Sequence, residues 1–389
     1  MAFADTASRP LCFRGVSVYA LADTEEPVRL IENTDLTVRP GEWVNIAGVN
    51  GSGKSTLARL LAGLHADGVS GVIDRGFAGS MPSPVVLQRP ESQLFGETPR
   101  EEVLFALEWR QFAPGQIEDT ANEALRRVGM LELADHPWHL LSGGQKQLAA
   151  AAAAAATASH GGCRLIVFDE ATSMLDDAHR QTVIGLARDL QRQGTTVIWV
   201  TQRLDELEPD DRTIAMKEGR IVFDGDGRSF FQETMQGGLT PCEACGLRLP
   251  YIVKLELEMK KQGERHASLP ASAEEWQKVW GFGGRPGLDG HLGKDDQWAE
   301  NGLFLEGLRL LDHRNRNAVE APLEARNLKL FPGTLTLILG PNGAGKTVFL
   351  EKLAGLRDPE GLMIRYQDES LWLRRKTGRA MRLNPRALR

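Results

Sequence analysis

Eight residues near the start of the chain have the types and the spacing of a phosphate-binding loop. The run from Gly48 to Ser55 reads GVNGSGKS and fits the pattern G-x-x-x-x-G-K-[ST]. Glycines let backbone N–H groups turn toward phosphate oxygens, and a following helix adds the positive end of its dipole. In this pattern Lys54 neutralises the β- and γ-phosphates, while the Ser55 hydroxyl holds Mg²⁺. The residues that we expect to contact a nucleoside triphosphate are Asn50, Gly51, Ser52, Gly53, Lys54, Ser55 and Thr56.

The residues around this loop predict the elements that must position it. Trp43 to Ala47 is a short apolar run typical of a strand. After the loop, apolar residues recur at helical spacing on one face, namely Leu57, Leu60, Leu61 and Leu64. Because the motif requires a strand before it and a helix after it, a chance glycine-rich turn is the weaker alternative. Upstream, Leu11 to Tyr19 predicts a strand, and Leu36 to Ala47 predicts two strands joined by a Pro40–Gly41 turn.

A second apolar run ends in two acidic residues. Leu165 to Asp169 is nearly continuous in apolar residues, which is typical of a strand buried on both faces of a parallel sheet. Acids that follow a strand are usually caps or turn residues. Downstream of a phosphate loop, however, we expect Asp169 to hold Mg²⁺ and Glu170 to polarise the hydrolytic water. Thr196 to Gln202 predicts another buried strand.

Three further polar features are candidates for the same site. A predicted strand ends at Gln88, whose side chain could reach both Mg²⁺ and the attacking water, although most glutamines at strand ends are merely solvated. A serine–glycine cluster opens a predicted helix, where its hydroxyl and free N–H groups could dock a second phosphate. The cluster consists of Ser142, Gly143, Gly144 and Gln145. Tyr19 could stack on an adenine ring, but an ordinary strand tyrosine is an equal alternative.

Taken in order, these segments resemble an ATP-binding-cassette ATPase domain. The matching segments are Gly48 to Ser55 (Walker A), Gln88 (Q-loop), Leu141 to Gln145 (signature), Leu165 to Glu170 (Walker B) and Ser173 to Asp176 (D-loop). The resemblance implies an α/β fold of the P-loop NTPase type, with ATP and Mg²⁺ as ligands. It also implies that two cassettes face each other head to tail. Each ATP then lies between the Walker A loop of one cassette and the signature of the other.

A closer resemblance is to the ATPase subunits of energy-coupling-factor vitamin and metal importers. It is carried by Gln88 to Thr98, by Gly246 to Pro250, and by Gly263, Pro270, Glu274 and Glu275. This resemblance implies an integral membrane partner, a helix of which docks beside Gln88 to Phe95, at the inner face of the cell membrane. A soluble cassette ATPase acting on ribosomes or DNA stays an alternative. A nucleotide-gated structural module with little turnover is another.

The chain departs from the resembling family at one catalytic position. A switch histidine is expected after the last core strand, and this chain has Gln202 there. We assign catalytic roles to Glu170, Gln88 and Gln202. Glutamine is neutral, and losing one donor aimed at developing charge typically costs about 10²–10³ in rate. We therefore predict that ATP binds at the Lys54 site but is hydrolysed slowly.

Composition agrees with a cytosolic enzyme. The chain has 389 residues and a net charge of −6, which argues against nucleic acid as a main partner. Four scattered cysteines predict a reducing compartment, and no apolar run approaches a membrane span. Cys242-x-x-Cys245 suggests zinc, with His266 as the nearest further ligand. Because a structural zinc site needs four ligands, two free cysteines are the better interpretation.

Beyond a glycine-rich linker the chain repeats itself. Asn327 to Gly333 parallels Asp35 to Gly41, and a second phosphate loop parallels the first at a constant offset. The second set of predicted ATP ligands is Asn342, Gly343, Ala344, Gly345, Lys346 and Thr347. This copy has no Q-loop glutamine, signature or acid-tipped strand, so we expect truncation or completion by another polypeptide. The predicted domains are a first cassette (1–236), a helical extension and linker (237–302) and a partial second cassette (303–389).

Overall fold

The computed structural model of this chain describes residues 8–20, 28–64, 68–160, 164–235 and 238–250. It also describes short segments farther along, namely 253–254, 257, 303–309, 324–330, 349–350, 363–366, 369–370, 372–374 and 380–382. The chain divides into two compact units, Met1–Gly283 and Gly284–Arg389, and each is described by itself. The second phosphate loop, the linker 281–302 and His266 lie outside the described residues. The division into three domains stays a prediction.

A six-stranded sheet forms the centre of the first unit, with the strand order β5-β6-β7-β3-β8-β9. In that order the strands are Val85–Val86, Leu165–Asp169, Thr196–Thr201, Trp43–Ala47, Arg212–Lys217 and Arg220–Asp226. Neighbouring strands from β5 to β8 are parallel, and β9 pairs antiparallel with β8. All residues of β3, β6 and β7 are buried, as their apolar runs predict for strands covered on both faces.

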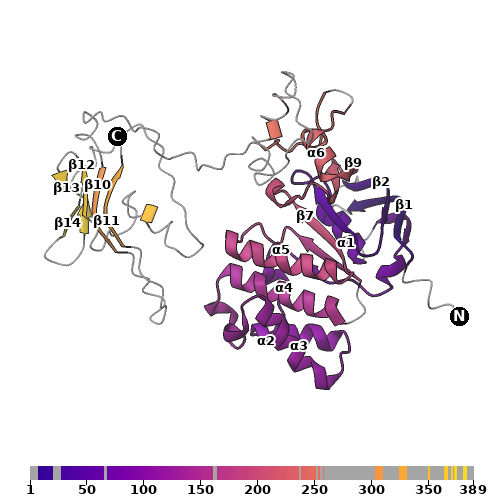
Figure 1. Ribbon diagram of the computed structural model, residues 1–389, viewed down its shortest axis with the longest axis horizontal. Helices are drawn as coiled ribbons and strands as arrows, with labels where there is room; N and C mark the ends of the chain where they lie inside the picture. The colour runs from indigo at the N-terminus through magenta and orange to yellow at the C-terminus, as the bar shows by residue number, and fades with distance from the viewer. Residues whose placement is uncertain are drawn as a thin grey trace, which may run out of the picture. The chain divides into compact units, whose positions relative to one another are not determined.

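An antiparallel sheet of three strands covers one face of the central sheet. Its order is β2-β1-β4, with β1 at Leu11–Ala20, β2 at Val28–Val38 and β4 at Val69–Asp74. The helix α1 (Lys54–Ala62) lies in the core that these two sheets share (Figure 1). Leu57, Leu60 and Leu61 of this helix are buried there, as predicted.

Leu64 does not belong to the buried face of α1, contrary to the sequence-based prediction. The helix ends at Ala62 because Gly63 adopts the left-handed conformation with φ 79° and serves as its C-cap. Leu64 therefore leaves the helical path, and it is 38% exposed.

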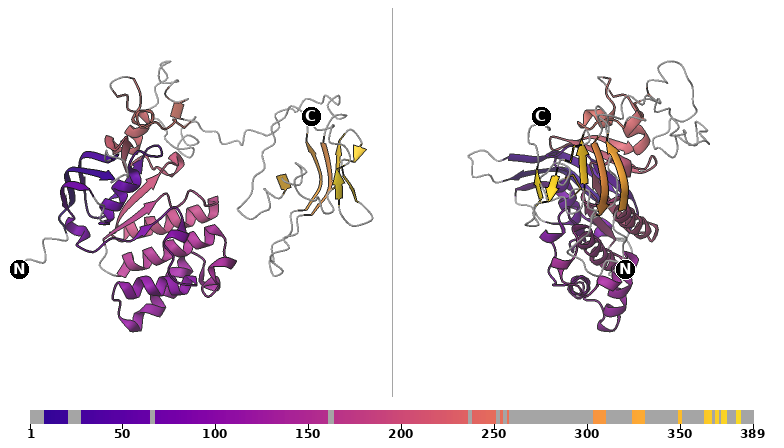
Figure 2. Two further views of the ribbon diagram at one scale, coloured as in Figure 1. Left: turned by 180° about the vertical axis from the view of Figure 1, so that it is seen from behind. Right: turned by 90° about the vertical axis from the view of Figure 1, so that its left-hand side faces the viewer.

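Helices cover the other face of the central sheet. They are α2 (Pro99–Trp109), α3 (Pro114–Arg127), α4 (Gly143–His160) and α5 (Asp177–Arg192). Both views show these helices gathered on one side of the sheet, with β1 and β2 on the other (Figures 1 and 2). The alanine run 149–156 in α4 is buried throughout, because small side chains let neighbouring elements approach closely.

Two short helices after β9 pack against residues of β3 and β8. The helices α6 (Gly227–Gln232) and α7 (Pro241–Ala244) share a small core with Ala47 and Ala215. In the second unit, the described strands β10 (Leu303–Arg309), β11 (Glu324–Leu330), β12 (Met363–Tyr366) and β13 (Glu369–Ser370) form an antiparallel sheet in the order β11-β10-β12-β13. A separate pair consists of β14 (Trp372–Arg374) and β15 (Ala380–Arg382).

Candidate active site

The phosphate-binding loop connects β3 to α1, as the sequence predicts. Lys54 begins α1, is 4% exposed, and its Nζ donates a hydrogen bond to the Val49 carbonyl at 3.0 Å. The same nitrogen lies 3.7 Å from Glu170 Oε1. Burial lowers the pKa of the Lys54 ammonium, and the carboxylates of Glu170 and Asp169 oppose that shift. A buried cation of this kind gains free energy when an anion enters beside it.

Two glycines of the loop could not be replaced without moving the backbone. Gly48 has φ 150°, and a Cβ there would lie 2.4 Å from the Met216 carbonyl oxygen. Gly53 has φ 100°, and a Cβ would lie 2.8 Å from the Leu30 carbonyl oxygen. The loop is therefore held against β8 and β2 in a shape that only glycine allows at these positions.

Oxygen donors suited to Mg²⁺ meet at the carboxyl end of β6. The Ser55 hydroxyl donates a hydrogen bond to Asp169 Oδ1 at 2.9 Å, and Gln88 lines the same cleft. Hydroxyl, carboxylate and amide oxygens are the ligands that Mg²⁺ prefers in proteins. Burial raises the pKa of Asp169, and the Ser55 hydrogen bond and the nearby Arg59 and Lys54 cations oppose that shift only in part. These three residues fit a bound magnesium ion.

Glu170 is held in a conformation that is unusual for its residue type. Its φ is 51°, in the left-handed region, and its backbone N–H donates to the Val200 carbonyl at 3.0 Å. Such a backbone typically costs about 1–3 kcal/mol and persists where surrounding structure fixes it, often at functional sites.

Gln202 joins the acid to the phosphate-binding loop. Its Nε2 donates to Glu170 Oε1 at 2.5 Å and to Asn50 Oδ1 at 2.7 Å. An amide nitrogen carries two hydrogens, so both donors are already engaged. The structure thus brings Gln202, Glu170 and Asn50 together, three residues that the sequence assigned to the site from separate segments.

These residues surround a cleft of about 580 Å³. Its lining includes residues that the sequence analysis missed: Val28, Arg29 and Leu30 on β2, and Glu218 and Gly219 after β8. The Glu218–Gly219 turn is fixed by a hydrogen bond from the Gly219 N–H to the Ser52 carbonyl at 3.0 Å. Gly219, as a typical turn residue, was the signal that the sequence offered. Tyr19 does not line the cleft, although it lies opposite Arg29 in the β1–β2 ladder and is 37% exposed.

The serine–glycine cluster lies at the N-terminus of α4 rather than in this cleft. Gln145 N–H donates to Ser142 Oγ at 3.2 Å, and Ser142 N–H donates to Gln145 Oε1 at 2.9 Å. This reciprocal pair is a capping box. None of the four predicted signature residues is among those that line the cleft.

A second surface feature is an aromatic patch on α2 and the segment before it. The patch consists of Phe95, Phe105 and Trp109, which are 75%, 42% and 71% exposed. Ring centroids are 5.2 Å apart for Phe95 and Phe105, and 6.3 Å apart for Phe105 and Trp109. The patch borders a groove of about 400 Å³ that α4 closes with Ala150, Ala153 and Ala154. Contiguous exposed aromatic side chains of this kind mark interaction surfaces.

Cys242 and Cys245 are free cysteines buried in the small core around α7. Burial raises the pKa of both thiols, which disfavours the thiolate form that metals bind. Within the described ranges, no group of three or more histidine, cysteine or acidic side chains is arranged to hold a metal ion. The helices of those ranges are also too short or too polar to cross a membrane.

Comparisons with known proteins give consistent results. The sequence model described as ABC transporter matches residues 31–173 and 323–385. The energy-coupling factor transporter ATP-binding protein EcfA1 of Clostridium novyi is 33% identical over 267 residues, covering 66% of this chain and 92% of that protein. The protein of the same name from Symbiobacterium thermophilum is 37% identical over 253 residues, covering 62% and 85%.

One solved structure resembles part of this chain. It is a dimeric ATP-binding cassette in a post-hydrolysis state, bound to ADP and phosphate. Its sequence is 25% identical, the TM-score is 0.50, and the match covers 57% of this chain and all of that one.

Proposed function

The chain belongs to the ABC transporter family, and on that premise we propose that it powers an importer of the energy-coupling-factor type through ATP-driven closure of paired cassettes. Membership of the family makes it an ATP-binding protein of the ABC ATPase type. The observation that carries the proposal is the meeting of Lys54, the Ser55–Asp169 pair and Glu170 around one cleft.

Each residue around the cleft has a chemical role in this proposal. Lys54 contacts the β- and γ-phosphates, which relieves the cost of burying its own charge. Ser55, Asp169 and Gln88 would hold Mg²⁺, and the bound ion would neutralise phosphate charge. Glu170 orients and polarises the attacking water as a general base.

Gln202 has a more restricted role. Both of its amide hydrogens are donated to Glu170 and Asn50, so a γ-phosphate gains a donor only when one of those bonds breaks. A neutral amide also stabilises developing negative charge less than a protonated imidazole would. Slow hydrolysis at this site follows from both effects.

The separation of the serine–glycine cluster from the cleft supports the pairing of cassettes. Ser142, Gly143, Gly144 and Gln145 present a helix N-terminus that reaches no nucleotide held by the Lys54 loop of the same unit. We propose that they contact ATP held by another cassette. That cassette is a second copy of the chain, a related chain, or the loop around Lys346.

The aromatic patch supports a membrane partner. It is apolar, exposed and adjacent to the Q-loop, so a helix of an integral membrane subunit could cover it and follow the cassette as it closes. We place the chain at the inner face of the cell membrane, against a subunit that imports a vitamin or a metal. The two curated relatives are named for the same class of transporter.

The test is purification of the tagged full-length chain from detergent-solubilised membranes of its source. We expect an integral membrane protein to co-purify, and labelled ATP to bind the complex but to bind less in Lys54→Ala. Purification with ribosomes or DNA instead would favour the non-transport class of ABC ATPase. Nucleotide binding without phosphate release, even in the complex, would favour a gated structural module.

A further inference from the structure

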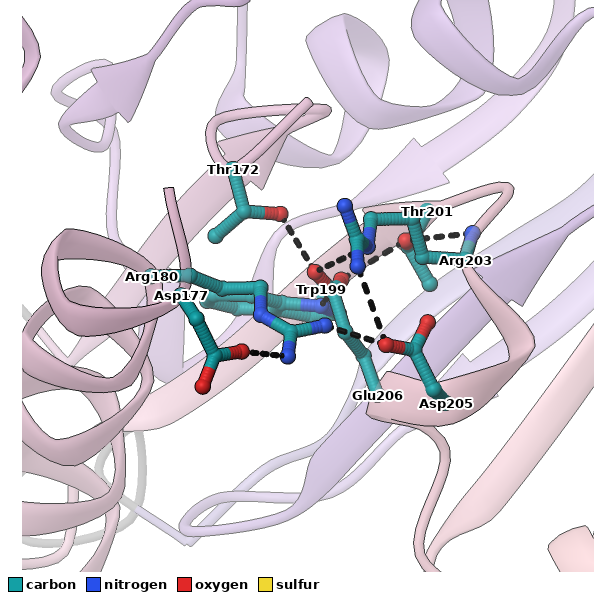
Figure 3. A network of polar contacts seen from close by, with 8 residues as sticks. All are labelled: Thr172, Asp177, Arg180, Trp199, Thr201, Arg203, Asp205 and Glu206. Atoms are coloured by element: carbon teal, nitrogen blue, oxygen red, sulfur yellow. Dashed lines mark hydrogen bonds and ion pairs between the residues drawn. The ribbon is translucent and has the colours of Figure 1, made fainter. Parts of the chain in front are cut away.

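A buried carboxylate, that of Glu206, is hydrogen-bonded to the segments that carry Glu170 and Gln202. Glu206 follows β7, and its side chain is 1% exposed. It accepts hydrogen bonds from the Thr172 hydroxyl at 2.6 Å, the Trp199 indole N–H at 3.0 Å and the Thr201 hydroxyl at 2.7 Å. Figure 3 shows Glu206 between these donors. A buried carboxylate is tolerated only when its oxygens are matched by donors in this way.

The donors come from the segments that carry the two catalytic side chains. Thr201 immediately precedes Gln202, and Thr172 follows Glu170 by two positions. Trp199 is fixed in the core by Trp43 and Phe168, with ring centroids 5.3 Å and 5.0 Å away. Glu206 therefore ties the Gln202 segment and the Glu170 segment to one immobile ring.

Two arginine side chains form ion pairs around Glu206, nearer the protein surface. Arg203 lies 3.5 Å from Glu206 and 3.0 Å from Asp205. Arg180 of α5 pairs with both Asp205 and Asp177 (Figure 3). These ion pairs are partly exposed and contribute little alone, whereas the buried bonds are directional and protected from water.

We propose that Glu206 is a positioning residue for hydrolysis. Its hydrogen bonds keep the Gln202 and Glu170 segments close together, so that the Gln202 amide donates to the Glu170 carboxylate. The inference rests on the proposed function in one respect, since it assumes that Glu170 and Gln202 act on the attacking water. Glu206 itself touches neither nucleotide nor water in this scheme.

The test uses the full-length chain and Glu206→Gln, which keeps the shape of the side chain. We expect single-turnover hydrolysis to fall by about 10-fold or more while nucleotide affinity changes less than about twofold. In a Gln202→Ala background, Glu206→Gln should have almost no further effect, because the two residues act through one arrangement. Additive losses in the double variant, or a loss of affinity equal to the loss of rate, would overturn the proposal.

A second readout does not depend on turnover. Hydrogen–deuterium exchange of the backbone should rise in residues 170–175 and 201–206 of Glu206→Gln, and not in Asp210→Asn, a matched change at an exposed carboxylate nearby. If Glu206→Gln fails to fold, Thr172→Val removes a single bond to the same carboxylate and should raise exchange in both segments. Unchanged exchange overturns the inference. A wild-type chain that binds no ATP overturns the proposed function instead.

Discussion

Gln202 is the side chain on which the proposed slow hydrolysis depends. It shares hydrogen bonds with Glu170 and Asn50, so its amide is positioned but fully used. An imidazole at the same place could hydrogen-bond to Glu170 through one nitrogen and keep its second nitrogen for the γ-phosphate. Under the proposed function, the residue type at position 202, rather than its placement, would limit the rate of hydrolysis.

We therefore expect Gln202→His to raise single-turnover hydrolysis by about 10-fold or more, because one more donor then faces the developing charge. Nucleotide affinity should stay nearly constant, since the Lys54 loop is untouched. The measurement is phosphate release under single-turnover conditions, with Gln202→Asn as the matched neutral control. Equal rates for the wild type and the histidine variant would show that this position does not limit turnover.

Asp169 is a buried carboxylate whose charge lowers the stability of the folded chain. Burial raises its pKa, so the ionised carboxylate destabilises the folded chain at any pH above that raised value. The cost declines as the pH falls through the folded-state pKa, and it disappears below the unfolded-state value. In the absence of nucleotide and Mg²⁺, this charge therefore makes the folded chain less stable at neutral pH.

Asp169→Asn should raise the melting temperature of the nucleotide-free chain at pH 7 by about 1–3 °C, because it removes a desolvated charge and keeps an oxygen for Ser55. The gain should vanish at acidic pH, where wild-type Asp169 is protonated. Added Mg²⁺ and ATP should stabilise the variant less than the wild type. Thermal melts with and without ligand test this, and a lower melting temperature for the ligand-free variant would contradict it.

The motif residues that line the cleft could be predicted one by one from the sequence, whereas their supporting contacts could not. Lys54, Ser55 and Asp169 follow from local motifs, and the structure brings them together. Glu206 carries no motif, since its role depends on donors that the fold brings from separate segments. Arg29 belongs to the cleft for the same reason, because the placement of β2 beside the phosphate loop is a tertiary property.

At the scale of elements, the buried strands were the most predictable parts. The predicted limits of β3 agree with the structure because its run is apolar and bounded by a turn and a loop. The strand before Gln88 was predicted too long, since only Val85 and Val86 pair with β6. Leu87 instead donates its N–H to Gln93 Oε1 at 2.7 Å and accepts from Gln147 Nε2 at 2.8 Å.

These side-chain bonds connect the aromatic patch with the cleft. Leu87 is held by Gln93 on one side and by Gln147 of α4 on the other, and it immediately precedes Gln88. Phe95 is fixed to α2 by its N–H, which donates to Glu102 at 2.7 Å. Hydrogen bonds therefore link the segment between the patch and Gln88 to both α2 and α4.

Phe95→Asp should uncouple transport from ATP hydrolysis, because a charge on the aromatic patch opposes docking of an apolar helix. Nucleotide affinity should be unchanged. Co-purification with the membrane partner and substrate uptake are the two measurements, with Val72→Asp on the exposed face of β4 as the matched control. Weaker nucleotide binding in Phe95→Asp, or equal losses in both variants, would count against a docking role.

At the scale of the whole molecule, the two units share a sheet topology. In the first unit β1 pairs antiparallel with β2 and β4, in the order β2-β1-β4. In the second unit β10 pairs antiparallel with β11 and β12, in the order β11-β10-β12. Each phosphate-loop sequence falls between the second and third of these strands in chain order. The shared order supports the proposal of a partial second cassette, as does the family match over residues 323–385.

If the second phosphate loop binds nucleotide, the full-length chain has two nucleotide sites. Replacing the lysine of that loop should then lower the number of nucleotides bound per chain. We expect equilibrium binding of a non-hydrolysable ATP analogue to fall from about two to about one nucleotide per chain in Lys346→Ala, and by the same amount in Lys54→Ala. The double variant should bind none, because each loop depends on its lysine for phosphate contact. Lys329→Ala, a lysine on β11 outside the loop, serves as the control and should leave the stoichiometry unchanged. If Lys346→Ala binds as much nucleotide as the wild type, the repeated loop contributes no site. The signature residues on α4 would then need a cassette from another chain.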